Sequence, residues 1–340
     1  MDFLYELGIF TAKTGLIIAA VLIILVAIFA LAARSRSRHR QELSVDKLND
    51  HYKWLRDVLQ SQILDKKELK SLKKLEKKEK KAKKHEPDRN RLFVLNFEGD
   101  IKATAVGSLR EEITSILTLA KPGDEVVLKL ESPGGMVSQY GLAASQLRRL
   151  RDAKIPLTVC VDTVAASGGY MMACVADKIL AAPFAVVGSI GVVAGVPNFH
   201  RLLERHNVDY KEFTAGEFKR TVSTFGEVTP AGVEKFKSQI EEIHSLFKVF
   251  VATNRPAIDI QKVSTGEYWY GSHAVALGLI DQITTSDDYL YAKSKEADLY
   301  EISYSHPEKM SDRLIKRLAE AGELALVRAF GFVRRSRYGI

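Results

Sequence analysis

Two short glycine-bearing turns supply the residue types that acyl-transfer chemistry needs. One is SPGG at residues 132–135 and the other is ASGG at residues 166–169, and each follows an apolar run. Glycine lets backbone N–H groups approach a substrate closely. Ser167 stands at the start of an expected helix, where N–H groups without a partner favour negative charge. The pattern is compatible with a serine nucleophile beside an oxyanion hole.

The segments around these turns alternate between strand-like and helix-like patterns. The strands are expected at residues 92–99, 125–132, 156–162 and 178–182, and the helices at residues 106–120, 139–153 and 165–176. Strands and helices that alternate at this spacing predict a parallel α/β sheet with right-handed crossovers. A longer helix is expected from Ala231 to about Ala252, with Thr229 as its N-cap.

Four motifs, in this order, resemble the SppA/SohB family of signal-peptide-peptidase-like serine proteases. They are Lys129–Val137 (KLESPGGMV), Val164–Met171 (VAASGGYM), Val187–Val193 (VGSIGVV) and Ala215–Arg220 (AGEFKR). The resemblance covers essentially the whole chain. It implies a ClpP/crotonase-like α/β fold, in which ββα units stack into a spiral, and it implies cleavage of signal peptides or other short hydrophobic, unfolded segments.

The resemblance also implies site residues. The family nucleophile falls on Ser167, the catalytic lysine on Lys219, and the oxyanion-hole amides on Gly134 and Gly168. In prokaryotic relatives with one protease domain, serine and lysine come from adjacent subunits of a ring, so we expect a homo-oligomer here. This chain departs from the family at Arg220, where an acidic residue is frequent, and the following TVSTFGEVTP matches the family only loosely. Both departures concern the positioning of Lys219.

A Ser-Lys dyad also follows a simple physical requirement. A serine hydroxyl must lose its proton as it attacks an amide carbonyl, so a neutral base must lie within hydrogen-bonding reach. A free lysine, with a pKa of about 10.4, is protonated at neutral pH, and burial favours its neutral form. We therefore expect Lys219 to lose solvent when the assembly forms.

The N-terminal part of the sequence predicts a membrane anchor. Residues 14–33 carry no charged side chain, and a helix of that length spans roughly 30 Å, the thickness of the hydrocarbon core. A cleavable signal peptide would have a shorter apolar run. The resemblance implies the cell inner (plasma) membrane. Arginines at 34, 36, 38 and 40 favour a cytoplasmic protease domain by the positive-inside rule, whereas SppA relatives are generally placed on the periplasmic side.

The expected organisation has five parts. They are a flank at residues 1–13, the anchor at 14–33, a basic helical stalk at 34–91, the protease domain at 92–305 and a basic amphipathic helix at 306–340. The net charge of +8 resides in the stalk, which argues against a nucleic-acid-binding body. The stalk is either solvated or bound to anionic lipid headgroups. The C-terminal helix packs on a neighbouring subunit or lies at the membrane interface.

Three other functions are compatible with parts of this pattern but fit the sequence less well than a Ser-Lys dyad protease. A ClpP-type Ser-His-Asp peptidase needs a histidine about 25 residues after the serine, and His200 and His206 instead fall on an expected surface helix. A crotonase-like enzyme would need no serine nucleophile and no anchor. A catalytically inactive membrane scaffold is the non-enzyme alternative, against which the presence of both Ser167 and Lys219 argues. No cofactor, metal-ligand cluster or nucleotide loop is expected, and Cys160 and Cys174 are expected as buried small side chains, with a disulfide left open.

Overall fold

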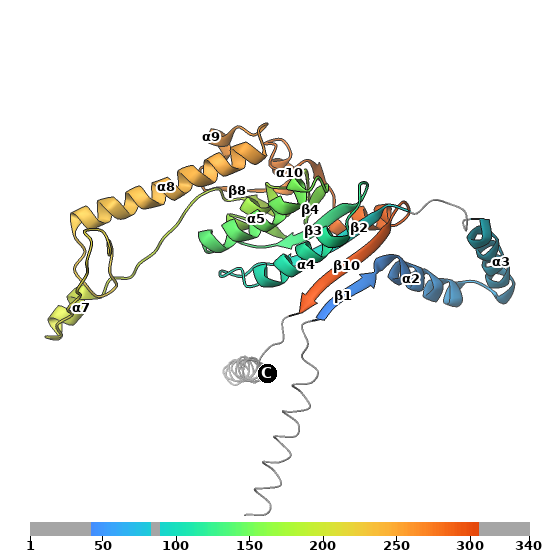
Figure 1. Cartoon of the computed structure of the whole chain (residues 1–340), viewed down its shortest axis with the longest axis horizontal. Coiled ribbons are helices and arrows are strands. Elements are labelled where there is room, and N and C mark those ends of the chain that lie inside the picture. The colour runs from blue at the N-terminus through green and yellow to red at the C-terminus, as the bar shows by residue number, and fades with distance from the viewer. Residues whose placement is uncertain (1–41, 83–88, 306–340) are drawn as a thin grey trace, which may run out of the picture. The chain divides into compact units, whose positions relative to one another are not determined.

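The computed structural model describes residues 42–82 and 89–305 (Figure 1). The expected flank at 1–13, the anchor at 14–33 and the C-terminal helix at 306–340 lie outside these residues. Among the helices within the described ranges, none is both long and apolar enough to cross a membrane. The membrane anchor therefore stays a prediction from the sequence.

A seven-stranded sheet forms the centre of the fold, in the order β1-β10-β2-β3-β4-β6-β9. The pairs from β10 to β9 are all parallel. Its strands are β1 (Glu42–Lys47), β2 (Arg91–Glu98), β3 (Glu125–Glu131), β4 (Leu157–Val161), β6 (Lys178–Ala181), β9 (Gln282–Ile283) and β10 (Asp298–Ser305).

Both faces of this sheet are covered, as the apolar runs of its strands require. On β2, Phe93, Leu95 and Phe97 point into the larger core cluster, whereas Leu92 and Val94 belong to a second cluster on the opposite face. This alternation follows from the two-residue period of a strand. The larger core is built with helices α4 (Val106–Leu119), α5 (Val137–Asp152) and α6 (Gly168–Ala173), and the smaller one includes residues of α11 (Ser286–Lys293).

A second, three-stranded sheet leads into the turn that contains Ser167. It consists of β5 (Val164–Ala166), β7 (Val186–Gly188) and β8 (Tyr268–Tyr270), with β5 parallel to β7 and β8 antiparallel to it. One helix was expected over residues 165–176, and the structure instead has the strand β5 up to Ala166 and the helix α6 from Gly168 to Ala173. Pairing of β5 with β7 and with Ser132 draws Val164–Ala166 into a strand, so the helix begins only at Gly168.

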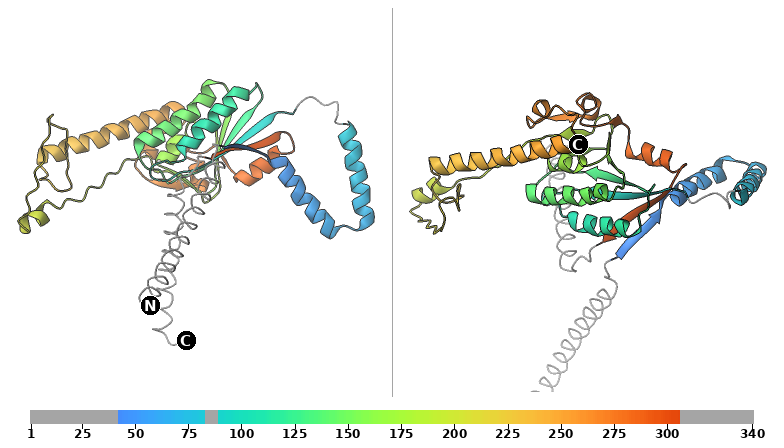
Figure 2. Two further views of the ribbon diagram at one scale, coloured as in Figure 1. Left: turned by 60° about the horizontal axis from the view of Figure 1, so that its bottom comes forward. Right: turned by 45° about the horizontal axis from the view of Figure 1, so that its top comes forward.

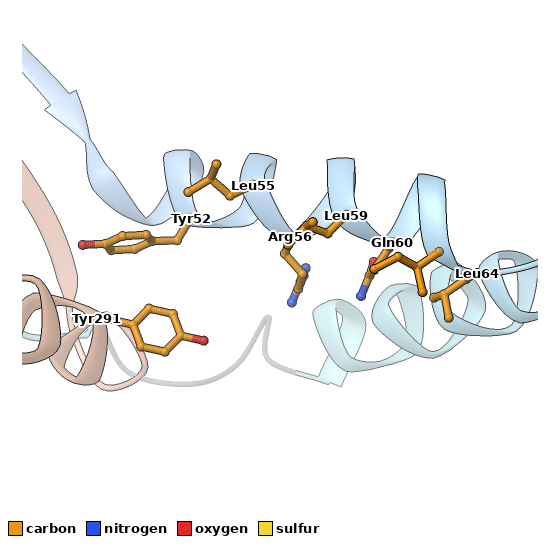
Figure 3. A pocket seen from close by; sticks show the side chains of 8 residues that line it. Tyr52, Leu55, Arg56, Leu59, Gln60, Leu64 and Tyr291 are labelled. Carbon is orange, nitrogen blue, oxygen red and sulfur yellow. The ribbon is translucent and has the colours of Figure 1, made fainter.

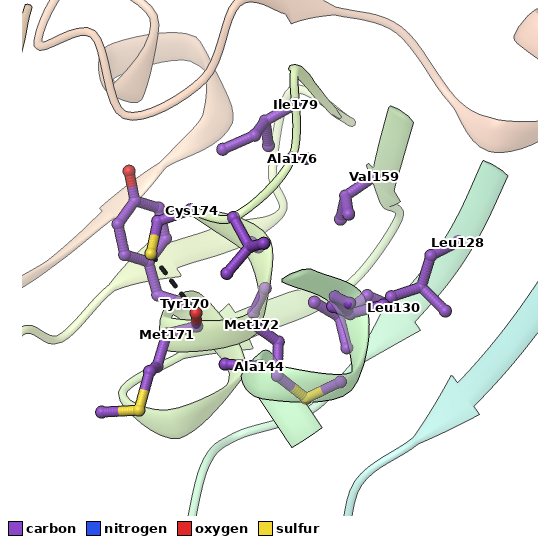
Figure 4. Packing of buried hydrophobic residues seen from close by; sticks show 14 of the residues in the cluster. Leu128, Leu130, Ala144, Val159, Tyr170, Met171, Met172, Cys174, Ala176 and Ile179 are labelled. Atoms are coloured by element: carbon purple, nitrogen blue, oxygen red, sulfur yellow. Dashed lines mark hydrogen bonds between the residues drawn. The ribbon is translucent and has the colours of Figure 1, made fainter. Parts of the chain in front are cut away.

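The two cysteines are free and buried. Burial raises the pKa of each thiol to about 12. Cys174 lies in the apolar packing around α6, where its Sγ donates to the Met171 carbonyl over 3.3 Å (Figure 4). The expectation of two buried small side chains is confirmed, and no disulfide joins them.

The long helix α8 (Pro230–Asn254) begins where the sequence predicted. The Thr229 side chain accepts a hydrogen bond from Gly232 N–H over 3.1 Å, and Pro230 occupies the first turn, where a missing N–H costs nothing. Between β7 and α8 runs an extended segment, residues 192–229, which includes α7 (His200–Arg205). We refer to residues 192–229 as the projecting segment. The remaining short helices are α9 (Ile260–Val263) and α10 (Gly271–Ala274).

Two helices occupy most of the described stalk, α2 (Leu48–Ile63) and α3 (Lys66–Ala82). Residues Glu42–Lys47, expected as part of the helical stalk, instead form β1 and extend the main sheet beside β10. The reason is that β10 presents an edge with unpaired backbone groups, and pairing with it outweighs the charged surroundings of β1. The α/β class is confirmed, and the two sheets agree with the ClpP/crotonase-like fold that the resemblance implies.

Candidate active site

Ser167 occupies a sharp turn between β5 and α6. Its backbone has φ +52° and ψ −116°, a conformation that residues with a side chain rarely adopt. The Ser167 N–H donates to the Gly188 carbonyl at the end of β7 over 2.8 Å, and its own carbonyl accepts from Met171 N–H over 2.9 Å. A half-buried serine held in a strained strand-to-helix turn is the geometry that presents a nucleophile to a substrate.

The helix after Ser167 fixes the turn by burial. All six residues of α6 are buried, and its Met172 packs in the cluster that includes Leu130 of β3 and Ala144 of α5 (Figure 4). The Tyr170 hydroxyl donates to the Leu279 carbonyl over 2.9 Å, and burial raises the pKa of this phenol far above its ordinary value. The first N–H groups of a helix have no partner within it, so Gly168 N–H is suited to receive an anion.

The structure brings the SPGG turn against Ser167. Gly134 has φ +93°, and a Cβ at its position would lie 2.8 Å from the Ala166 carbonyl oxygen, from Gly168 N and from Ser167 Cβ. Only glycine fits this approach. Three of the residues singled out from the sequence, Ser167, Gly134 and Gly168, are therefore neighbours.

The Gly134 amide has a partner of its own. Its N–H donates to Ser132 Oγ over 3.1 Å, and Gly134 is buried. The next residue, Gly135, is exposed, and none of the hydrogen bonds found in residues 42–82 and 89–305 uses its N–H. The turn thus has one N–H, that of Gly134, bonded to the Ser132 side chain, and a second N–H, that of the exposed residue Gly135, without such a bond.

Lys219 is not brought to Ser167 within one chain. It is exposed in the projecting segment, where its N–H closes a turn onto the Gly216 carbonyl over 3.1 Å. The neighbouring Arg220 is held by Glu212, with 2.8 Å between Nε and Oε1. Figures 1 and 2 show α7 and the beginning of α8 well away from the sheets. Within the described part of the chain, the dyad is not assembled.

The projecting segment exposes unusually many apolar side chains. Val193 is 95% exposed and Phe213 is 91% exposed, and further exposed side chains are those of Phe199, Leu202, Val208, Tyr210, Phe218 and Phe225. Its hydrogen bonds, such as Phe199 N–H to the Thr224 carbonyl, join residues of the segment to one another. An apolar surface of this extent is typical of a protein–protein contact.

Within residues 42–82 and 89–305, no histidine is hydrogen-bonded to Ser167. His200 and His206 lie at α7 in the projecting segment, and His200 Nε2 is 3.5 Å from Glu204 Oε1. They are surface residues of that segment, as expected from the sequence. No group of acidic, histidine and cysteine side chains with metal-binding geometry occurs among the described residues.

A different hollow, of about 540 Å³, lies on α2 and contains none of these residues. It is lined by side chains of α2 and of its C-terminal turn, together with Tyr291 of α11 (Figure 3). The lining is almost wholly apolar and offers no nucleophile or base. The chemistry suggested by the sequence therefore belongs to the two glycine turns and not to this hollow.

Sequence reasoning gave no role to the side chain of Ser132, the first residue of the SPGG turn, and missed Tyr140 and Gly99, which lie against it. Ser132 Oγ and the Tyr140 hydroxyl lie 2.6 Å apart, and both side chains are fully buried. A Cβ on Gly99 would lie only 2.3 Å from Ser132 Oγ. A buried tyrosine among the alanines and leucines of α5 was the one available signal, because a buried hydroxyl requires a partner.

Comparisons with known proteins agree with these observations. Residues 2–147 match the model of the peptidase family S49 N-terminal region, and residues 149–300 match that of peptidase family S49. The chain is 47% identical to "Probable protease SohB" of Haemophilus influenzae, covering 95% of this chain and 94% of the relative. It is 41% identical to "Putative protease SohB" of Buchnera aphidicola subsp. Baizongia pistaciae, covering 91% and 93%.

One solved structure with a similar chain path is a lysine-to-alanine mutant of the 1510-N membrane-bound stomatin-specific protease in complex with a substrate peptide. It is 14% identical, with a TM-score of 0.42, and the match covers 68% of this chain and 99% of that one.

Proposed function

The chain belongs to peptidase family S49, and we propose that it is a membrane-anchored serine endopeptidase with Ser167 as nucleophile and Lys219 as general base. The observation that carries this proposal is the strained backbone of Ser167 at the end of β5, packed against Gly134. Strain at a residue with a side chain persists only where the surroundings impose it, and it concentrates at functional sites.

In the proposed mechanism, the Ser167 hydroxyl attacks the carbonyl carbon of the scissile amide while a neutral lysine amine takes its proton. The tetrahedral oxyanion receives hydrogen bonds from Gly168 N–H and from the SPGG turn. Gly134 was expected to donate from that turn, and the exposed N–H of Gly135 lies next to it. Collapse of the intermediate releases the amine, which takes the proton from the lysine, and water then hydrolyses the acyl-enzyme.

We propose that Lys219 reaches Ser167 of a neighbouring subunit in a homo-oligomeric ring. The support is twofold. Lys219 stands on a segment whose hydrogen bonds are internal apart from those at Thr229, which caps α8, and that segment presents exposed apolar side chains such as Phe213 for a contact between subunits. Such a contact would also strip water from the lysine, and loss of water favours the neutral amine that a general base requires.

The proposed substrates are signal peptides or other short hydrophobic, unfolded segments. Beside the SPGG turn, Ile101 is 72% exposed and Met136 is 50% exposed, and Met136 N–H donates to the Ile101 carbonyl over 2.8 Å. These two side chains form an apolar edge next to the nucleophile. A substrate with apolar side chains near the scissile bond would bury this edge, which favours binding.

The proposed location is the cell inner membrane, with residues 14–33 as a single span. Two arguments give opposite sides for the protease domain. The arginines after the span favour the cytoplasm, and the resemblance to SppA favours the periplasm. A C-terminal fusion to a reporter enzyme that is active only outside the cytoplasm distinguishes the two sides. Reporter activity indicates a periplasmic protease domain. No activity of this reporter, together with activity of a second reporter that works only in the cytoplasm, indicates a cytoplasmic domain.

The test of the dyad uses the full chain in detergent with a panel of hydrophobic peptides. We expect Ser167→Ala and Lys219→Ala to abolish cleavage, since each removes a group that bonds to the reacting atoms or their protons. Lys211→Ala, which removes another exposed lysine of the projecting segment, serves as the matched control and should cleave normally. Full activity of Lys219→Ala would refute the assignment of the base, and an inert but correctly assembled wild type would favour the inactive scaffold.

A further inference from the structure

Two buried hydroxyl groups lie at the SPGG turn, that of its first residue, Ser132, and that of Tyr140. Ser132 Oγ is 2.6 Å from the Tyr140 hydroxyl, which in turn lies 2.8 Å from the Asp100 carbonyl oxygen. Gly134 N–H meets the same Ser132 Oγ over 3.1 Å. These four groups form a chain of hydrogen bonds in which the Ser132 and Tyr140 side chains are fully buried and Asp100, at its end, is exposed.

The direction of each hydrogen bond in this chain is determined. A carbonyl oxygen only accepts, so Tyr140 donates its single proton to Asp100. Ser132 must then donate to the Tyr140 oxygen, and its own oxygen accepts from Gly134 N–H. Burial raises the pKa of Tyr140 above its ordinary value, so the phenol keeps its proton at neutral pH. The network has one arrangement and fixes the orientation of the Gly134 peptide.

The same two residues also support the nucleophile turn. A Cβ on Gly168 would lie 2.4 Å from the Tyr140 ring, so the ring packs directly against the backbone that follows Ser167. The backbone of Ser132 pairs with β5, since its N–H donates to the Val164 carbonyl over 2.8 Å and its carbonyl accepts from Ala166 N–H over 3.0 Å. One serine therefore joins the SPGG turn to the strand that ends at Ser167.

We propose that Ser132 and Tyr140 are positioning residues that hold the oxyanion-binding turn and the Ser167 turn in a fixed mutual geometry. The proposal deepens, and rests on, the proposed function of the site. Neither side chain reaches the reacting atoms, because both are buried below the turns. Their effect on the reaction comes through the backbone that they hold in place, which is the SPGG turn and the residues after Ser167, and small displacements of donors on this backbone are costly to the rate.

Gly99 gives an independent way to disturb this network. A Cβ at residue 99 would lie 2.3 Å from Ser132 Oγ and 2.5 Å from the Tyr140 hydroxyl oxygen. The backbone of Gly99 does not have a positive φ, so alanine is permitted there on conformational grounds. Gly99→Ala would therefore act by pushing the two hydroxyl groups apart. The matched control is Gly141→Ala on α5, where an added Cβ meets no atom within 4 Å.

The experiment compares three variants of the full chain, Tyr140→Phe, Ser132→Ala and Gly99→Ala, with the wild type. The controls are Gly141→Ala and Tyr289→Phe, the latter because its hydroxyl is also hydrogen-bonded, to Glu125 Oε1 over 2.6 Å, but on α11. The readouts are kcat and KM for one hydrophobic peptide, the rate of Ser167 labelling by a fluorophosphonate, and the melting temperature. All rates are measured at least ten degrees below the lowest melting temperature.

We expect each of the three variants to lower kcat and the labelling rate by about tenfold or more, with KM changed less than about threefold, because an oriented oxyanion donor is worth about 10²–10³ in rate. Both controls should keep wild-type rates. A folded variant of any of the three with wild-type kcat and labelling refutes the positioning role, and so does an equal loss in Tyr289→Phe. If Tyr140→Phe does not fold, Ser132→Ala and Gly99→Ala decide by the same criterion.

The two proposals fail in different ways. An inactive wild type, or a Ser167→Ala variant that cleaves, overturns the proposed function, whatever the network variants do. An active wild type that needs Ser167, together with unaffected network variants, overturns only the role of Ser132 and Tyr140.

Discussion

Mixing two inactive chains tests whether Ser167 and Lys219 meet across a subunit boundary. The perturbation is co-expression of a Ser167→Ala chain and a Lys219→Ala chain in equal amounts, with different affinity tags so that mixed assemblies are purified in two steps. Lys219 is exposed on the projecting segment, and Figure 1 shows α7 of that segment well away from the sheets. A dyad shared between subunits therefore takes its serine from one chain and its lysine from the next.

The expected activity follows from counting sites. With random assembly in a closed ring, about a quarter of the sites receive an intact serine and an intact lysine, so mixed assemblies should recover about a quarter of wild-type activity. Each variant alone gives none. A matched mixture of Ser167→Ala with Lys211→Ala should give about half, since only the serine is then limiting.

The assay is initial-rate cleavage of a hydrophobic peptide, normalised to the amount of assembled protein. If the mixture of Ser167→Ala and Lys219→Ala stays inactive while the mixture with Lys211→Ala reaches about half of wild type, the dyad lies within one chain. The projecting segment would then have to fold back onto its own Ser167, and the reasoning from its position would be wrong.

Two further predictions concern the scaffold. Thr229→Ala should lower the free energy of unfolding by about 1 kcal/mol, because it removes the N-cap of α8, and amide hydrogen exchange should accelerate in the first turn of α8; unchanged exchange would contradict the capping role. At Asp281, burial alone would raise the carboxyl pKa, but hydrogen bonds from Arg255 and from Ile179 N–H outweigh it and hold the pKa below its ordinary value of 3.8. A carboxyl whose pKa is lowered in the folded state contributes stability above its unfolded-state pKa, and this stability is lost as the pH falls. In Asp281→Asn, the free energy of unfolding should therefore fall less steeply with decreasing pH below about pH 4 than in the wild type. An unchanged dependence on pH would refute this.

Local signals in the sequence predicted much of the fold. The apolar run of β3 and the spacing of Leu109, Ile113 and Ile116 on α4 correspond to buried faces in the structure. Thr229 followed by proline marked the beginning of α8 within one residue. These features depend on neighbours along the chain, which is why they can be read without knowing the tertiary structure.

Other features depend on partners far away in the sequence. Residues Glu42–Lys47 are surrounded by charged helical sequence, and only the edge offered by β10 makes them a strand. Ala165 and Ala166 were expected in the first turn of a helix, and pairing with β7 places them in β5, the strand directly before Ser167. In both places a ladder of non-local hydrogen bonds overrides local preference, as strand formation often does.

The candidate site also has a part that local sequence signals predicted and a part that depends on contacts formed only in the folded chain. The proposed nucleophile could be placed on Ser167 because SPGG and ASGG are short local motifs that can be matched to a family without knowledge of the tertiary structure. The hydroxyl pair of Ser132 and Tyr140 could not be predicted in this way, since side chains eight residues apart meet only once the turn has folded around the space left by Gly99.

The position of the proposed base, Lys219, depends on the assembly if the dyad is shared between subunits as proposed. One chain alone holds Ser167 in its strained turn and supports it with its own buried network, whereas Lys219 stays in solvent on an apolar segment. A lysine in water is protonated and cannot accept the serine proton. If the ring forms as proposed, the contact that buries Phe213 also delivers and desolvates the base. An isolated chain would then carry a prepared nucleophile with no proton acceptor, and cleavage would be confined to assembled protein.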